Sequence, residues 1–192
     1  MFTFKTLATR ASAVCLLLGL SVAPLFSQAA AEQKQPQAKT KAENDAYMQL
    51  ESYARLGNLD KFVETGERFI RDFPQADNNT KKFVLQRMMT AYQQKNDFAK
   101  TVEYGDKLLA IEPYDLPALL VVSSMLAQLL PTTEEDKKGA QVDKALDYCS
   151  RAKAEIELLQ RPAEIPDVLW TAEKNKLLAT VDSSIRVVEA NR

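Results

Sequence analysis

Histidine is missing from all 192 residues of this chain. It is the commonest general base and the commonest metal ligand, so its absence argues against the usual catalytic and metal sites. The two cysteines, Cys15 and Cys149, have no histidine with which to form a Cys–His nucleophile. The five glycines are scattered and form no phosphate-binding loop. These absences predict a protein that is not an enzyme and that binds neither a cofactor nor a metal.

The scarcity of glycine also bears on the fold. Many Ala, Leu, Lys, Glu and Gln residues accompany the five glycines, and this composition favours helix over sheet. Hydrophobic residues make up 46% of the chain and charged residues 27%, as in an ordinary soluble domain. The length suits one domain with a hydrophobic core. The composition therefore predicts a single all-α domain.

Residues 1–31 have the features of a secretory signal peptide. Lys5 and Arg10 form a basic region, an apolar stretch follows, and cleavage after Ala29 or Ala31 fits an A-x-A-like site. The apolar stretch is shorter than the roughly 20 residues of a spanning helix, although an uncleaved membrane anchor remains an alternative. We therefore expect an exported protein, periplasmic or secreted, that does not insert into a membrane after cleavage.

The charge of the mature chain is small. Removing Lys5 and Arg10 leaves 23 basic residues against 26 acidic ones, a formal charge of about −3 that offers no attraction for nucleic acid or anionic lipid. Cys149 would then have no intrachain disulfide partner, and we interpret it as a small apolar residue on a helix face. Residues 32–43 are polar and rich in Gln and Lys, which predicts a flexible linker.

A repeat organises the rest of the chain. The segment 58–74, NLDKFVETGERFIRDFP, returns 39 residues later as DFAKTVEYGDKLLAIEP. Gly66 and Pro74 match Gly105 and Pro113, and the same shift carries Tyr53 to Tyr92 in the preceding segments. Self-similarity at such a period predicts stacked helical units. Because glycine inside a helix costs about 1 kcal/mol, the two matched glycines predict close approach of a neighbouring helix.

The hydrophobic spacing predicts three helical hairpins and a last helix in residues 44–192. The partner helix of the first hairpin ends at Phe73 or sooner because a residue before proline is pushed out of helix. Leu116 to Leu130 is apolar on nearly all faces, which predicts a buried first helix of a third unit. We expect an enlarged loop with one helical turn over 132–140, and a capping helix over 167–189.

The two matched units resemble tetratricopeptide repeats. In that family a Tyr ends the first helix, a Gly-acid-aromatic turn follows, and Pro closes the second helix. The matching residues are Tyr53, Gly57, Phe69, Pro74, Tyr92, Asp97, Phe98, Leu108 and Pro113. The usual tryptophan is replaced by Ala46 and Leu85, and the period is five residues longer than the usual 34. The resemblance implies a right-handed α-α superhelix, a solenoid of about three hairpins plus a C-terminal cap.

The resemblance also implies a binding face. In such proteins the first helices line a concave surface that holds a peptide. The positions that correspond here are Tyr47, Glu51, Ala54, Arg55, Gln86, Thr90, Gln93 and Gln94, with Leu120, Ser124 and Gln128 in the third unit. Tyr47 and Glu51 replace the Lys and Asn with which some members hold a C-terminal carboxylate, so we expect no partner with an acidic C-terminal tail.

These observations predict a non-catalytic protein–protein interaction scaffold of the bacterial cell envelope that binds a peptide or partner protein. Two alternatives stay open. The repeats could dock a larger envelope complex through their convex face, or a pocket around Tyr47 and Tyr53 could bind a small molecule or glycan. A closed apolar pocket with few polar groups would favour the second alternative. An enzyme would need a cluster of perturbed carboxylates in a cleft.

Overall fold

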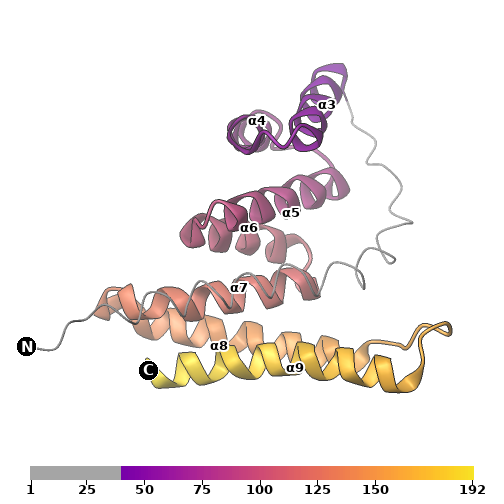
Figure 1. The fold of residues 1–192 in the computed structure, drawn as a ribbon. Helices are drawn as coiled ribbons and strands as arrows, with labels where there is room; N and C mark the ends of the chain where they lie inside the picture. The colour runs from indigo at the N-terminus through magenta and orange to yellow at the C-terminus, as the bar shows by residue number, and fades with distance from the viewer. Residues whose placement is uncertain (1–39) are drawn as a thin grey trace, which may run out of the picture. The chain divides into compact units, whose positions relative to one another are not determined.

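The computed structural model describes residues 40–192, and in that range it contains helices and no strand (Figure 1). The helices are α3 (Lys41–Arg55), α4 (Leu59–Asp72), α5 (Asn78–Gln94), α6 (Phe98–Ile111), α7 (Leu116–Leu129), α8 (Glu135–Leu158) and α9 (Asp167–Ala190). The predicted signal peptide and most of the predicted linker lie outside the described residues. The all-α prediction is confirmed for the part that the structure describes.

The helices pack in chain order. Each helix from α3 to α8 lies against the next one, and α9 lies against both α8 and α7 (Figure 1). The pairs α3/α4, α5/α6 and α7/α8 are therefore three successive hairpins, and the last helix closes the row. This arrangement is a tetratricopeptide-like helical-repeat solenoid, as the repeat predicted.

The turn inside each of the first two hairpins confirms the 39-residue register. Gly57 has φ +65° and Asn96, its counterpart, has φ +57°. Both lie in the left-handed region, which Gly adopts freely and Asn tolerates. Asn58 and Asp97 then cap α4 and α6 in the same way, each accepting a bond through its side chain from the backbone N–H three residues on. Both helices stop before their proline.

The two repeated glycines lie where the hairpins meet. A Cβ at Gly66 of α4 would fall closer than 3.0 Å to Sδ of Met88 on α5, and a Cβ at Gly105 of α6 would fall as close to a methyl group of Val122 on α7. Met88 and Val122 are fully buried. The prediction that these glycines permit close helix approach is confirmed. Each brings the second helix of one hairpin against the first helix of the next.

The first helix begins earlier than the predicted boundary of the linker at residue 43. Helix α3 starts at Lys41, and the Thr40 hydroxyl accepts a bond of 3.0 Å from the Glu43 N–H. Thr followed three residues later by Glu is the spacing of a capping box, so residues 40–43 hold a signal that outweighs their polar composition. Glu43 is only 3% exposed, so it belongs to the fold and not to the linker.

The predicted enlarged loop over 132–140 is wrong in its second half. A 3-10 turn covers Leu130–Thr132, and α8 already begins at Glu135. Two acidic residues, Glu135 and Asp136, lie in its first turn, where they interact favourably with the positive end of the helix dipole. Gly139 is therefore helical, with open space around the position of a Cβ.

The core runs through the hairpins and is densest at α7. Leu119, Val122, Met125 and Leu126 of this helix are all at most 2% exposed, because α6, α8 and α9 cover it. The prediction of a buried first helix in the third unit is confirmed. Cys149 on α8 is fully buried as well, as its interpretation as a small apolar residue required.

Candidate binding surfaces

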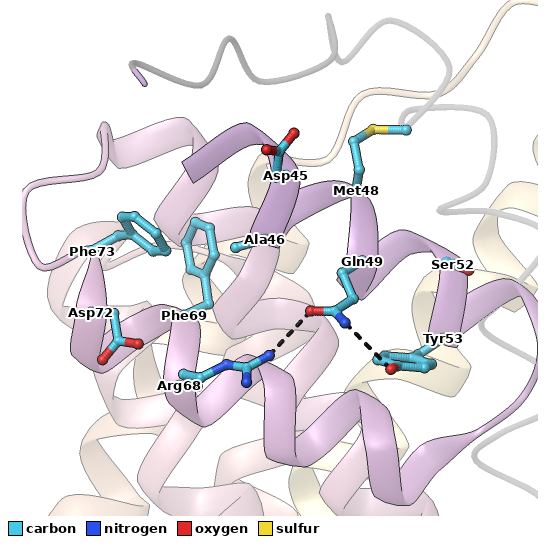
Figure 2. A pocket seen from close by; sticks show the side chains of 10 residues that line it. All are labelled: Asp45, Ala46, Met48, Gln49, Ser52, Tyr53, Arg68, Phe69, Asp72 and Phe73. Atoms are coloured by element: carbon cyan, nitrogen blue, oxygen red, sulfur yellow. Dashed lines mark hydrogen bonds between the residues drawn. The ribbon is translucent and has the colours of Figure 1, made fainter. Parts of the chain in front are cut away.

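An open hollow of about 740 Å³ lies between α3 and α4 (Figure 2). From α3 it is lined by Asp45, Ala46, Met48, Gln49, Ser52 and Tyr53, and from α4 by Arg68, Phe69, Asp72 and Phe73. The α3 residues lie three or four apart, so they share one face of the helix. The hollow is thus built from one face of each helix of the first hairpin.

Polar groups bridge the two walls of the hollow. The Arg68 guanidinium donates to Oε1 of Gln49 at 3.1 Å, and Nε2 of Gln49 donates to the Tyr53 hydroxyl at 3.4 Å (Figure 2). The Phe69 and Phe73 rings pack against each other with centroids 5.1 Å apart. The hollow therefore combines aromatic surface with hydrogen-bonding groups, one cation and two carboxylates, a combination suited to an amphipathic ligand.

The predicted binding residues of α3 lie on a different face of that helix. Tyr47 is 4% exposed and packs on Phe83 of α5, with ring centroids 5.5 Å apart. Burial and then the neighbouring Glu51 raise the pKa of Tyr47 to about 12. Glu51 is half-buried and lies 3.5 Å from the Arg87 guanidinium of α5, whereas Arg55 is exposed. Tyr47 and Glu51 thus join α3 to α5, and Arg55 remains open to solvent.

The predicted residues of α5 form a polar stripe. Gln86, Thr90, Gln93 and Gln94 are spaced by four, three and one, which places them along one side of the helix. Thr90 and Gln94 are exposed, and the other two are half-buried. The Thr90 hydroxyl donates to the carbonyl of Gln86 at 3.0 Å. Among residues 40–192 the three glutamine side chains make no hydrogen bond, so their amides are available to a ligand.

The predicted residues of α7 are more enclosed. Ser124 and Gln128 are half-buried, and the Gln128 amide donates to the carbonyl and the hydroxyl of Ser124 at 3.3 and 3.4 Å. Leu120 is 8% exposed and belongs to the core. The α7 positions therefore offer less free polar surface than the stripe on α5.

None of the eleven predicted binding residues lines the hollow, although some of them lie on α3. The resemblance to tetratricopeptide repeats placed the binding residues along the first helices of the three hairpins. The hollow instead lies beside α3, the first described helix of the row. A comparison within the chain could have found it. Asp45, Gln49 and Ser52 stand 39 residues before Val84, Met88 and Ala91, so polar residues occupy positions that are apolar in the second unit.

Carboxylates on the second helix of one hairpin bind side chains of the next hairpin. The Tyr92 hydroxyl donates to Glu67 of α4 at 2.6 Å, and the Lys100 ammonium lies 3.9 Å from the same carboxylate. Burial, followed by the bond to Glu67, raises the pKa of Tyr92. The Lys144 ammonium and the Tyr148 hydroxyl of α8 bind Asp106 of α6. Since Asp106 is the repeat counterpart of Glu67, the second and third units each receive an acidic group from the unit before them.

The comparisons with known proteins are few. No protein-family model matches the chain, and no curated protein matches it. Among solved structures, the crystal structure of a thermophilic TPR protein from Thermus thermophilus is similar, with a TM-score of 0.40 and 18% sequence identity. The match covers 78% of this chain and 74% of that one. A match this weak supports no conclusion about the fold, which rests on the helix packing described above.

Other kinds of site are not evident in the described part. Residues 40–192 contain no group of three or more Cys, Asp or Glu side chains placed to hold a metal ion. None of the helices in this range is long and apolar enough to cross a bilayer. Burial raises the pKa of the Cys149 thiol, which lowers its fraction of reactive thiolate. Two surfaces remain as candidates, the polar stripe on α5 and the hollow between α3 and α4.

Proposed function

We propose that the protein is a non-catalytic interaction scaffold of the bacterial cell envelope, exported by residues 1–31, that binds a peptide or partner protein across its first helices. The observation that supports this most directly is the stripe of Gln86, Thr90, Gln93 and Gln94 on α5. Amide side chains both donate and accept hydrogen bonds, so a row of them can pair with the backbone of an extended peptide. Arg55 on α3 adds an exposed positive charge.

Rigid presentation is the second support. A stripe serves recognition best when its helix does not reorder on binding, because ordering costs affinity. The opposite side of α5 is fixed by Val84, Leu85, Met88 and Met89, which are at most 4% exposed. The side chains of the stripe are therefore carried on a helix that is anchored on both neighbouring helices.

The alternative of a small-molecule or glycan binder would need a pocket around Tyr47 and Tyr53. These two residues do not share one, because Tyr47 is buried against Phe83 and Tyr53 lines the hollow. The hollow is open, whereas small-molecule sites enclose most of their ligand. We therefore favour a macromolecular partner.

Site-specific photo-crosslinking in the producing cell tests the proposal. A benzoylphenylalanine at Gln94 should give a protein adduct, because this exposed residue lies on the stripe. The matched control is the same probe at Ala110, an exposed residue of α6. Equal adducts at both positions, or none at Gln94 or Thr90, would reject the stripe as the binding face. Fractionation of the same cells tests export, since a cytoplasmic protein would contradict it.

A further inference from the structure

We propose that the hollow between α3 and α4 docks an amphipathic helix of a partner protein, one that carries a small residue followed directly by Glu or Asp. The equivalent surface of the second unit is covered by another helix of the same chain, and its contacts indicate what would bind here. It concerns a different surface from the stripe on α5 and does not depend on what binds there.

The second unit shows what covers this surface when it is occupied. The shift of 39 residues carries Ala46, Gln49 and Tyr53 of α3 to Leu85, Met88 and Tyr92 of α5, which are at most 6% exposed. Helix α4 covers them and sets Gly66 against Met88. Among residues 40–192 no helix covers the corresponding face of α3, and Gln49 is exposed there.

A tyrosine and a lysine at this end indicate a carboxylate on the partner. In the second unit Tyr92 and Lys100 both meet Glu67, which directly follows Gly66. The counterparts in the first unit are Tyr53 and Lys61. Lys61 pairs with Glu64 of its own helix at 2.8 Å, and its side chain is 55% exposed. The first unit thus has the tyrosine and lysine that receive a carboxylate elsewhere.

These two groups lie near each other. The pKa of Lys61 is raised first by its bond to Glu64 and also by the nearby Tyr53 hydroxyl. Tyr53 accepts a bond from Gln49, which leaves its own proton available for donation to a carboxylate. Asp45 lines the hollow eight residues from Tyr53, about 12 Å along the helix, so it does not compete for the same position.

The hollow is also suited to a partner that binds reversibly. Asp45, Gln49 and Ser52 replace Val84, Met88 and Ala91, so the empty face is compatible with water. Apolar contact remains available from Met48, which is 46% exposed, and from the half-buried ring of Phe73. A mixed surface of this kind is typical of a reversible interface, whereas a permanent one is more apolar.

The chain itself does not supply such a helix. Three small-acidic pairs lie on second helices. Gly66-Glu67 and Gly105-Asp106 already face the next hairpin, and Ala154-Glu155 of α8 has a glutamate, not an apolar residue, three positions after its alanine. Residues 1–39 contain one such pair, Ala31-Glu32, but lack the apolar residues three and four positions after the small residue that α4 and α6 share. We therefore assign the occupant to a different protein.

A labelled peptide with the sequence of residues 58–74, titrated against the full chain, tests the proposal by fluorescence anisotropy. We expect saturable binding that weakens about tenfold when the peptide carries Glu67→Gln, the effect of losing a charge-assisted hydrogen bond. The full chain with Lys61→Gln should bind the unchanged peptide about two- to fivefold more weakly, because its counterpart Lys100 lies 3.9 Å from Glu67 without a hydrogen bond. Tyr53→Phe, which removes the counterpart of the Tyr92 hydroxyl, should no longer distinguish the two peptides, because the bond to Glu67 is then already lost.

The matched control is Lys100→Gln, which removes the equivalent lysine of the second unit. Docking on the hollow predicts that Lys100→Gln leaves binding unchanged. A peptide that displaced α4 from α5 would instead depend on Lys100 and not on Lys61, and that result would overturn the proposal. If the peptide shows no saturable binding while the Gln94 crosslink still forms, the proposal is wrong and the hollow is a solvent-facing end of the solenoid. If the chain alone forms dimers and Lys61→Gln dissociates them, the hollow binds a second copy of the chain, and that result would also overturn the proposal.

Discussion

Gly105 of α6 faces Val122 of α7 so closely that a Cβ on the glycine would fall inside 3.0 Å of a valine methyl group. Gly66 stands in the same relation to Met88, but the two neighbours differ in stiffness. A methionine side chain has three rotatable bonds and adapts, whereas a β-branched valine has one preferred rotamer in a helix. The same repeat position therefore tolerates an added methyl group differently in the two units.

Alanine at the two glycines should have unequal effects. We expect Gly105→Ala to lower the free energy of unfolding by about 1–3 kcal/mol through overpacking. Gly66→Ala should be close to neutral, because movement of Met88 and a helix-propensity gain of about 1 kcal/mol offset the crowding. Leucine at either position should lower the Tm. Urea denaturation measures these changes.

Gly139→Ala is the control, since a Cβ there meets no atom within 4 Å and α8 should gain stability. Equal losses for Gly66→Ala and Gly105→Ala would contradict the role given to side-chain stiffness. Val122→Ala combined with Gly105→Ala should recover part of the loss, because it removes the methyl group in the way.

The left-handed turns give a second prediction. Gly57→Ala should destabilise the protein by about 1–2 kcal/mol, because its φ of +65° is unfavourable for a residue with a Cβ. Asn96→Gly should be neutral or slightly stabilising, since φ there is +57° and Asn already tolerates it. Thermal unfolding of both variants provides the comparison. A larger loss for Asn96→Gly than for Gly57→Ala would mean that the Asn96 side chain makes a contact of its own.

Alkaline pH should destabilise the protein through its buried tyrosines. Burial raises the pKa of Tyr47 to about 12, and burial with the nearby carboxylate Glu67 raises the pKa of Tyr92 and Tyr104 above the usual value. Above about pH 10 the unfolded chain loses these protons first. The stability they contribute is therefore complete below about pH 10 and is lost as pH rises through the folded pKa values.

Tyr92→Phe should reduce this pH dependence. It removes one of the protons, so the slope of unfolding free energy against pH should fall by up to about 1.4 kcal/mol per pH unit. At neutral pH the variant should lose about 1 kcal/mol, because the 2.6 Å bond to Glu67 is gone. Urea titrations between about pH 9 and 11.5 measure the slope. An unchanged slope would show that the pKa of Tyr92 is no higher in the folded protein than in the unfolded chain.

Asp115 caps α7 and gives the last prediction. Its carboxylate accepts from the Ala118 N–H at 2.9 Å, and Asp115→Ala should cost about 1 kcal/mol. Burial raises the pKa of Asp115, although that bond and then Lys82 oppose the shift. Stability from the bound proton is thus complete below about pH 4 and is lost as pH rises through the folded pKa.

Asparagine at this position separates the cap from the charge. Asp115→Asn keeps an acceptor without the desolvated charge, so its stability relative to the parent should rise between about pH 3.5 and pH 7 by an amount of the order of 1 kcal/mol. Parallel urea titrations at the two pH values measure the difference. A difference that does not change with pH would show that the Asp115 charge carries no net cost in the fold.

Several features could be predicted from the sequence because they depend on local chemistry or on the repeat. The match of Gly66 with Gly105 predicted the close helix contacts, and the same 39-residue shift pairs Gly57 with Asn96, the two residues that the structure places in left-handed turns. The start of α3 was also readable, since Thr40 and Glu43 have capping-box spacing. The polar composition of residues 32–43 predicted a linker instead, because average composition does not reveal a single capping pair.

The sequence by itself determined the pairing of the helices into hairpins, their 39-residue register and the apolar stripes that form the core, because hydrophobic spacing and turn chemistry act over a few residues. Only the tertiary structure decided which polar side chains are free. Tyr47 was predicted as a binding residue, and packing on Phe83 buries it. The hollow beside Gln49 likewise exists only because, among the described residues, no helix precedes α3 in the row. Exposure depends on which surfaces find neighbours, and a helical pattern does not fix that.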